Sequence, residues 1–333
     1  MELIKKTNKS ILVIISEFGA KEYILPVLLD WLNKKKYNIE IVTNNNIKQS
    51  LIKELSPFIE NNQIRFFDNN KILSILKLEK YLCILSSATK NFSEYYIISQ
   101  AKLLKIPTVQ FIDNIYGFKS RLTYKDKSIF PEFLIVINKS CVKYANNEGV
   151  PSNIIRICGH PAWDDINKVK IKNNKKTLFV GSPIKKFYGY SLGYSERDVW
   201  NICLKIKKSH PRLISSLNYL NHPNQEIPNY INKRYATTNN KNAKLNKYGQ
   251  VVGLFSSHLT ESYLRGQKVV SIQANNIRDD KWIMSKYYKL NYAKNYKEAC
   301  NLLLSSQIID YNIIKDINCS KIKIQKLIDQ IIK

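Results

Sequence analysis

Residues 11–43 read ILVIISEFGAKEYILPVLLDWLNKKKYNIEIVT and contain the pattern on which the fold assignment rests. It opens with an apolar run of strand length at 11–16 and closes with another at 38–43. Between them, residues 21–35 carry apolar side chains at helical spacing, so these side chains share one face of a helix. A strand, a helix and a strand in close succession predict two parallel strands with a helix packed across them.

The same alternation repeats along the rest of the chain. In the first half we expect strands at 63–68, 81–86 and 108–113, and helices at 93–105 and at 47–55, where Pro57 should end the helix. In the second half we expect strands at 177–180, 251–255 and 268–272, and helices at 195–208 and 259–265. This spacing predicts parallel sheets covered on both faces. The fold class is therefore α/β, with two consecutive Rossmann-like, doubly wound domains.

A junction lies near the middle of the chain. Residues 159–164 read GHPAWD, and a second series of strands starts after them. The sequence thus predicts an N-terminal domain at 1–160, a C-terminal domain at 161–310 and a closing helix at 311–333.

Composition excludes several classes of protein. A chain of 333 residues with 44% hydrophobic residues has the length of about two domains and is not wholly disordered. Six cysteines are scattered singly, which excludes a disulfide scaffold and predicts thiols in a reducing cytoplasm. The apolar run at 11–15 is far shorter than the roughly 20 residues of a membrane-spanning helix. We expect a soluble, cytoplasmic protein.

The charge balance is strongly basic, with 53 Lys and Arg against 26 Asp and Glu and a formal net charge of +27. Lys, Asn and Ile are abundant together, as the codon usage of an AT-rich genome would give. The functional alternative is that the positive charge binds an anionic partner. That partner would be an acidic polymer or the inner face of an anionic membrane, which the protein would contact peripherally. No Arg-rich block or nucleic-acid motif is present, so nucleic acid is not an expected partner.

The candidate binding residues of the second half surround a turn from strand to helix. Residues 253–261 read GLFSSHLTE, which places Ser256 and Ser257 at the start of a helix and Glu261 in its first turn. The unpaired N–H groups and the dipole of a helix N-terminus suit a phosphate. The same serines can instead cap the helix, and the two roles are compatible.

Two further features of the second half can contact a nucleotide. His222-Pro223 follows an apolar run, which puts His222 at the end of a strand, where it can hydrogen-bond or protonate a leaving phosphate. A surface histidine is the alternative. Gly181 and Ser182 begin a loop rich in Gly, Ser and Lys that either contacts phosphate through its backbone or is an ordinary solvated loop.

In the first half the candidate residues are acidic. Asp113 closes an apolar strand, where a carboxylate can take a proton from an acceptor hydroxyl. A turn-forming Asp is the alternative, and Glu17 is the rival base. No His/Cys ligand cluster or metal-binding motif is present, so we expect neither a metal nor a cofactor.

These features together resemble a known family. The two Rossmann-like halves, the GHPAWD junction and the turn at 251–261 followed by GQKVVSI at 266–272 resemble GT-B glycosyltransferases. The Gly-x-Pro-x-x-Asp junction is also similar to that of the related UDP-N-acetylglucosamine 2-epimerases. His222-Pro223 with Ser256-Ser257 resembles the HP and SS motifs of bacterial sialyltransferases and polysialyltransferases, which use CMP-activated nonulosonic acids. The resemblance implies two domains facing a central cleft, with His222, Pro223 and the serines on the donor's phosphate.

The resemblance leaves the base and the donor open. The families' catalytic acid lies in an Asp/Glu-Asp/Glu-Gly motif that this chain lacks, so Asp113 is assigned as the base by its position. Teichoic-acid glycerophosphotransferases, which use CDP-glycerol, also carry His-Pro and Ser-Ser elements.

The leading hypothesis is a metal-independent glycosyltransferase of bacterial surface glycan biosynthesis. It would move a sugar from a nucleotide-sugar donor onto a hydroxyl of a glycan, which could be acidic or lipid-linked. The first choice of donor is a CMP-nonulosonate. The alternatives are a CDP-glycerol-type glycerophosphotransferase, a UDP-sugar transferase and an enzyme like UDP-N-acetylglucosamine 2-epimerase. A non-enzymatic protein that binds an anionic polymer comes last.

Overall fold

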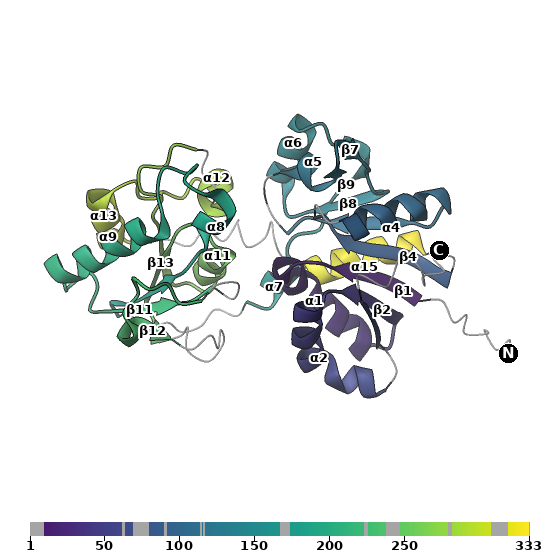
Figure 1. Ribbon diagram of the computed structural model, residues 1–333, viewed down its shortest axis with the longest axis horizontal. Coiled ribbons are helices and arrows are strands. Elements are labelled where there is room, and N and C mark those ends of the chain that lie inside the picture. Colours follow the sequence, from purple (N-terminus) through teal and green to yellow (C-terminus); the bar gives the residue numbers. More distant parts are fainter. Residues whose placement is uncertain are drawn as a thin grey trace. The chain divides into compact units, whose positions relative to one another are not determined.

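The computed structural model describes residues 10–61, 64–68, 80–89, 92–113, 115, 117–166, 174–222, 226–237, 247–278, 282–307 and 319–332. The chain divides into two compact units, one formed by Met1–Asp165 with Lys315–Lys333 and the other by Ile166–Ile314. Each unit is built on its own parallel sheet (Figure 1). None of the helices described is long and apolar enough to cross a membrane.

The first unit has a seven-stranded parallel sheet in the order β3-β2-β1-β4-β5-β8-β9. Its strands are β1 Ser10–Ile15, β2 Asn38–Thr43, β3 Ile64–Asp68, β4 Tyr81–Ser87, β5 Thr108–Phe111, β8 Phe133–Val136 and β9 Ile155–Ile157, with a separate hairpin of β6 Thr123–Tyr124 and β7 Lys127–Ser128. Its helices are α1 Phe18–Asn33, α2 Asn45–Glu60, α4 Phe92–Leu103, α5 Phe118–Arg121, α6 Lys139–Asn147, α7 Pro161–Asp164 and α15 Ser320–Ile331. The strand order reverses between β1 and β4, and ligands of such sheets bind at the carboxyl ends of the strands beside that reversal.

Strand β1 shows why this sheet is covered on both faces. All six of its residues are buried, as expected of a central strand in a parallel sheet. Ile11, Val13 and Ile15 pack in the cluster that contains α1, whereas Leu12 and Ile14 pack in the cluster that contains α4. Because successive side chains of a strand point to opposite faces, the two helices cover opposite sides of the sheet.

The C-terminal helix α15 belongs to the first unit although it comes last in the chain. Its Ile324, Leu327 and Ile328 pack in the core cluster of α1, and Figure 1 shows it in yellow alongside that helix. Asp164 accepts hydrogen bonds from the backbone N–H groups of Ser320 and Lys321, at 2.9 and 2.8 Å.

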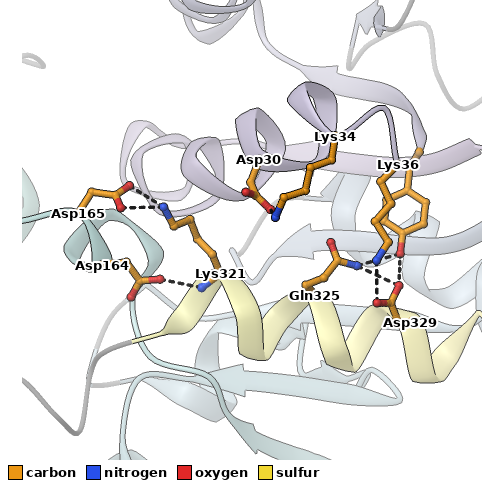
Figure 2. Close-up of polar contacts among 9 residues, drawn as sticks. Asp30, Lys34, Lys36, Asp164, Asp165, Lys321, Gln325 and Asp329 are labelled. Carbon is orange, nitrogen blue, oxygen red and sulfur yellow. Dashed lines mark hydrogen bonds and ion pairs between the residues drawn. The ribbon is translucent and has the colours of Figure 1, made fainter.

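Further polar contacts hold both ends of α15 (Figure 2). At its start, the ammonium of Lys321 pairs with Asp165 at 2.6 Å. At its other end, Asp329 accepts from the Lys36 ammonium at 2.8 Å and from the Tyr37 hydroxyl at 2.5 Å. Asp164, the last residue of the GHPAWD stretch, therefore caps the start of the final helix.

The second unit has a five-stranded parallel sheet in the order β12-β11-β10-β13-β14. Its strands are β10 Lys176–Val180, β11 Ser216–Leu220, β12 Ala236–Thr237, β13 Gln250–Gly253 and β14 Lys268–Ser271. Its helices are α8 Ile184–Tyr188, α9 Glu196–Ser209, α11 Ser257–Leu264, α12 Ile283–Tyr288 and α13 Tyr296–Leu304. The order reverses between β10 and β13. In the core, Trp200 of α9 packs edge-on against Phe179 and Tyr219, with ring centroids 5.3 and 5.7 Å apart.

One expectation about the helices is wrong. Pro57 does not end the second helix, because α2 continues to Glu60. Phe58 and Ile59, which follow the proline, pack against the core of the first unit. This packing holds the last turn in place, although proline removes one of its hydrogen bonds.

Candidate functional site

The first candidate cluster lies at the carboxyl edge of the first unit's sheet. Glu17, the N-cap residue of α1, lies two residues beyond the end of β1, and Asp113 lies two residues beyond the end of β5. A guanidinium nitrogen of Arg121, the last residue of α5, lies 3.7 Å from Oδ1 of Asp113. Gly19 lies against the same carboxyl, since a Cβ at position 19 would overlap Oδ2 of Asp113. The structure therefore brings the expected base, its rival and an arginine into one cluster.

The two carboxyls of this cluster are tuned by their surroundings. Burial raises the pKa of the Asp113 carboxyl, and the positive charge of Arg121 opposes that shift. The pKa of Glu17 is also raised, chiefly by desolvation, with Arg121 lowering it and the negative charge of Asp113 raising it further. Carboxyls whose pKa lies above the ordinary range can hold and release a proton closer to neutral pH, which is what acid–base chemistry needs.

A buried carboxyl fixes the loops around this cluster. Glu94, in the first turn of α4, is 1% exposed and accepts hydrogen bonds from the Ser87 hydroxyl at 2.6 Å and from the backbone N–H of Thr89 at 2.8 Å. The Ser16 side chain, directly before Glu17, also hydrogen-bonds to it. Burial nevertheless raises the pKa of Glu94 to about 7. Glu94 thus ties the loop after β1 to the loop after β4.

An aromatic layer lies behind the cluster. Tyr23 of α1 stacks on Phe111 of β5 with ring centroids 4.7 Å apart, and its hydroxyl donates to the carbonyl of Gly159 at 2.8 Å. His160 stacks on Trp163 at 4.0 Å, and burial lowers its pKa to about 3. The histidine of the GHPAWD stretch is therefore neutral at physiological pH and acts as a packing residue.

The second candidate cluster lies at the carboxyl edge of the second unit's sheet. Ser256 is the N-cap of α11, and its hydroxyl accepts from the backbone N–H of His258 at 3.2 Å. Ser257 is the first residue of α11 and is exposed. Glu261 lies 3.5 Å from Nδ1 of His258, whose side chain is almost fully buried. The strand-to-helix turn at 253–257 thus presents a helix N-terminus with an exposed hydroxyl.

The loop after β10 reaches the same edge of the sheet. Gly181 donates its N–H to the carbonyl of Leu220 at 2.9 Å, and a Cβ there would meet the Tyr219 hydroxyl at 2.5 Å, so only glycine fits. The backbone N–H of Ser182 donates to Glu196 at 3.1 Å. Gly181 and Ser182 follow β10 while Ser256 and Ser257 follow β13, so the two pairs flank the reversal of strand order, where α/β sheets bind their ligands.

His222 lies elsewhere along that edge. It follows β11 by two residues, and β10 lies between β11 and β13. Two strand spacings, about 10 Å, therefore separate the strand ends that carry His222 and Ser256. Pro223 lies outside the described residues.

Sequence reasoning missed Arg121, Glu94 and the contact of Gly19 with Asp113. The sequence offered one reason to single out Arg121. Only eight of the 53 basic residues are arginines, so each arginine is a candidate for a specific role in a chain that otherwise uses lysine. Nothing in the sequence singles out Glu94 or Gly19, because both contact residues that are distant along the chain and become neighbours only in the folded protein. Among the described residues, no group of three or more His, Cys, Asp or Glu side chains is placed to hold a metal ion.

Comparison with known proteins identifies the fold. No protein-family model matches the chain, and no curated protein matches it by sequence. The structure is similar to that of MnaA from S. aureus with UDP, at 12% identity over 96% of this chain and 95% of that one, with a TM-score of 0.65.

Two further solved structures are similar over nearly their whole length. UDP-GlcNAc 2-epimerase from Methanocaldococcus jannaschii matches at 11% identity over 96% of this chain and 98% of that one, with a TM-score of 0.62. UGT71G1 from Medicago truncatula, complexed with UDP-glucose, matches at 12% identity over 98% and 99%, with a TM-score of 0.57. The expected fold class, α/β of the GT-B type with two Rossmann-like domains, is confirmed.

Proposed function

We propose that this protein is an enzyme that acts on a UDP-sugar, most simply a glycosyltransferase, with donor binding in the second unit and the acid–base group in the first. One observation carries the proposal. Glu17 and Asp113, two carboxyls with raised pKa, lie together with Arg121 at the carboxyl edge of a Rossmann-like sheet. A transferase of the GT-B type needs such a base for the acceptor hydroxyl.

In the proposed reaction the cluster of the second unit binds the donor, and the cluster of the first unit supplies the base. The N-terminus of α11 and the hydroxyl of Ser257 would bind the donor's diphosphate. Gly181 and Ser182 would border it across the strand reversal, with their own N–H groups already donating to Leu220 and Glu196. Asp113 would take the proton of the acceptor hydroxyl as its oxygen bonds to the anomeric carbon. The bond from that carbon to the phosphate oxygen breaks, and UDP leaves with the electron pair. Hydrogen-bond donors already aimed at the phosphate stabilise the charge that develops there.

The choice of UDP replaces the CMP donor expected from the HP and SS motifs. The solved structures described above are of enzymes whose descriptions name UDP, UDP-GlcNAc or UDP-glucose. The separation of His222 from Ser256 by the width of β10 also weakens their joint assignment to a single phosphate. Both points favour the UDP-sugar alternative. An acidic or lipid-linked glycan remains the acceptor we propose for a chain of net charge +27.

A second candidate function is epimerisation of a UDP-sugar. The pairing of Glu17 with Asp113 favours it, because inverting a carbon that bears hydrogen requires one proton to be removed and another delivered. The similarity to UDP-GlcNAc 2-epimerases points the same way. Such an enzyme would turn over its substrate without any acceptor.

Nuclear magnetic resonance in D2O separates these possibilities. The protein is incubated with UDP-GlcNAc, with UDP-glucose or with a CMP-sialic acid, each with and without a mixture of glycan acceptors. A transferase releases UDP only when acceptor is present, whereas an epimerase incorporates deuterium into the sugar ring without acceptor. Asp113→Asn should abolish either reaction. Turnover of the CMP-sugar alone would overturn the proposal.

A further inference from the structure

The second unit contains an open pocket that borders the proposed phosphate site at Ser182 and extends away from α11. Its volume is about 670 Å³, within the roughly 300–1,000 Å³ of small-molecule sites. The loop after β10, the first turn of α9 and the segment after β11 line it. None of its lining residues comes from β13 or α11. It therefore lies on the β11 side of β10, away from the reversal between β10 and β13.

The charges that line this pocket are predominantly positive. Lys185, Lys186 and Arg197 line it, and in the described part of the chain none of the three forms an ion pair with a carboxylate. Its one lining carboxylate, Glu196, is 5% exposed and accepts from the Ser182 N–H and the Tyr219 hydroxyl. Glu196 is thus engaged by the protein itself, and the three cations face the pocket without an acidic counterpart.

Two aromatic rings accompany these cations. The ammonium of Lys185 lies 5.1 Å from the ring centroid of Tyr190, and the guanidinium of Arg197 lies 5.9 Å from that of Tyr230. Tyr190 is 74% exposed, an unusual position for an aromatic ring in a folded chain. Aromatic faces beside cations suit a ligand that carries both a ring and a negative charge.

We propose that this pocket binds an anionic saccharide, a sugar that bears a phosphate or a carboxylate, at a site separate from the nucleotide. The cations would bind the anionic group, and the tyrosines would contact the sugar ring. The volume greatly exceeds that of a single oxyanion, which favours a whole sugar over a free ion. This saccharide would be the acceptor of the transfer reaction, a role that rests on the proposed transferase function, whereas the binding itself does not.

Calorimetric titration of the full chain tests the proposal. Glucose 6-phosphate and glucuronate serve as the phosphorylated and carboxylated probes, with glucose and inorganic phosphate as controls. We expect one or both anionic sugars to bind and glucose to bind far more weakly. Lys185→Gln combined with Lys186→Gln, and separately Arg197→Gln, should weaken binding about tenfold or more, since each removes a charged partner.

The matched control is Lys205→Gln. Lys205 lies on α9 outside the pocket, with its ammonium 4.7 Å from the ring centroid of Tyr296, so the substitution removes the same charge from a similar contact. We expect it to change affinity less than about twofold, as a screened surface charge should. An equal loss in Lys205→Gln would show attraction to the net charge of the protein and would overturn the proposal.

Saturating UDP separates this proposal from the function proposed above. If the pocket is distinct, glucose 6-phosphate binds equally well with UDP present, and it binds even if the protein has no affinity for UDP. Displacement by UDP would identify the pocket as part of the nucleotide site, and binding of inorganic phosphate as tight as that of the anionic sugars would exclude a saccharide site. Either result contradicts the proposal.

Discussion

Gly19 and the carboxyl of Asp113 lie so close together that the space between them admits only a hydrogen atom. Gly19 is in the first turn of α1, after β1, and Asp113 follows β5, so the contact joins the start of α1 to the loop after β5 at the sheet's carboxyl edge. The glycine therefore sets the position of the proposed base.

Replacing this glycine should displace the carboxyl rather than unfold the protein. In Gly19→Ala the new methyl group overlaps Oδ2, and the short Asp113 side chain must rotate away. A displacement of about 1 Å at a reacting group can cost on the order of 100-fold in rate. We expect kcat/KM to fall by roughly that factor, with a small change in the free energy of unfolding.

A double-mutant cycle supplies the control for this prediction. In the background of Asp113→Ala the oxygen that the methyl group meets is gone, so adding Gly19→Ala should change the residual rate and the stability little. Additive effects of the two substitutions on kcat/KM would contradict a direct coupling between the residues.

Arg121 should set the pH dependence of activity. Its charge lowers the pKa of both Asp113 and Glu17, against the upward effect of burial. Removing it in Arg121→Met raises these pKa values. Because a base must be deprotonated to act, activity is lost as pH falls through its pKa, and that loss then occurs at higher pH. We expect the acidic limb of the kcat/KM profile to move up by about one pH unit.

The comparison for this substitution is Arg156→Met. Arg156 lies on β9 with its guanidinium 4.8 Å from the ring centroid of Phe133, in contact with neither carboxyl. Its loss should leave the pH profile in place. An acidic limb that stays fixed or moves down in Arg121→Met would argue against Asp113 and Glu17 as the titrating groups.

Substitutions of the neighbouring serines Ser256 and Ser257 should have different effects, one on the free energy of unfolding and the other on UDP affinity. Ser256 caps α11 with its hydroxyl, so Ser256→Ala should cost about 1 kcal/mol of unfolding free energy. Ser257 is exposed, and Ser257→Ala should leave stability within about 0.5 kcal/mol while weakening UDP binding. Denaturant unfolding and UDP titration of both variants check this. Unchanged UDP affinity in Ser257→Ala would remove its hydroxyl from the phosphate site.

Asp164, which ends the GHPAWD stretch, and Asp165, which follows it, should differ in their contribution to stability (Figure 2). Asp164 accepts two backbone N–H groups at the start of α15, and Asp164→Ala should destabilise the first unit by about 1–2 kcal/mol. Among the described residues Asp165 contacts Lys321 through a surface ion pair, and its replacement by Ala should cost less than about 0.5 kcal/mol. Equilibrium unfolding measures both, and equal costs would contradict the capping role of Asp164.

Much of the fold could be predicted because its strands are continuous apolar runs. The run at 11–15 has no polar alternation, which indicates a strand buried on both faces, and the structure places it inside the sheet, between β2 and β4. The single-turn helix α5 and the hairpin of β6 and β7 could not be predicted, because elements of two to four residues have no periodicity to detect.

The sequence predicted where each candidate residue lies on its own strand but not which candidate residues are neighbours. A carboxylate at the end of an apolar run predicts a position at the sheet's carboxyl edge, and both Asp113 and Glu17 lie there. Which strand ends are neighbours depends on strand order, which the sequence does not display. For that reason the insertion of β10 between the strands of His222 and Ser256, and the approach of Arg121 to Asp113, emerged only in the structure.

We propose a UDP-sugar as the substrate, and thermal unfolding with free nucleotides is the sharpest test of that proposal. UDP at about a hundred times its dissociation constant should add about 2.7 kcal/mol of stability and raise Tm, whereas CMP should not. Ser257→Ala should reduce the UDP-induced shift, and Asp113→Asn should retain it. Stabilisation by CMP rather than UDP, or by neither nucleotide, would contradict the account.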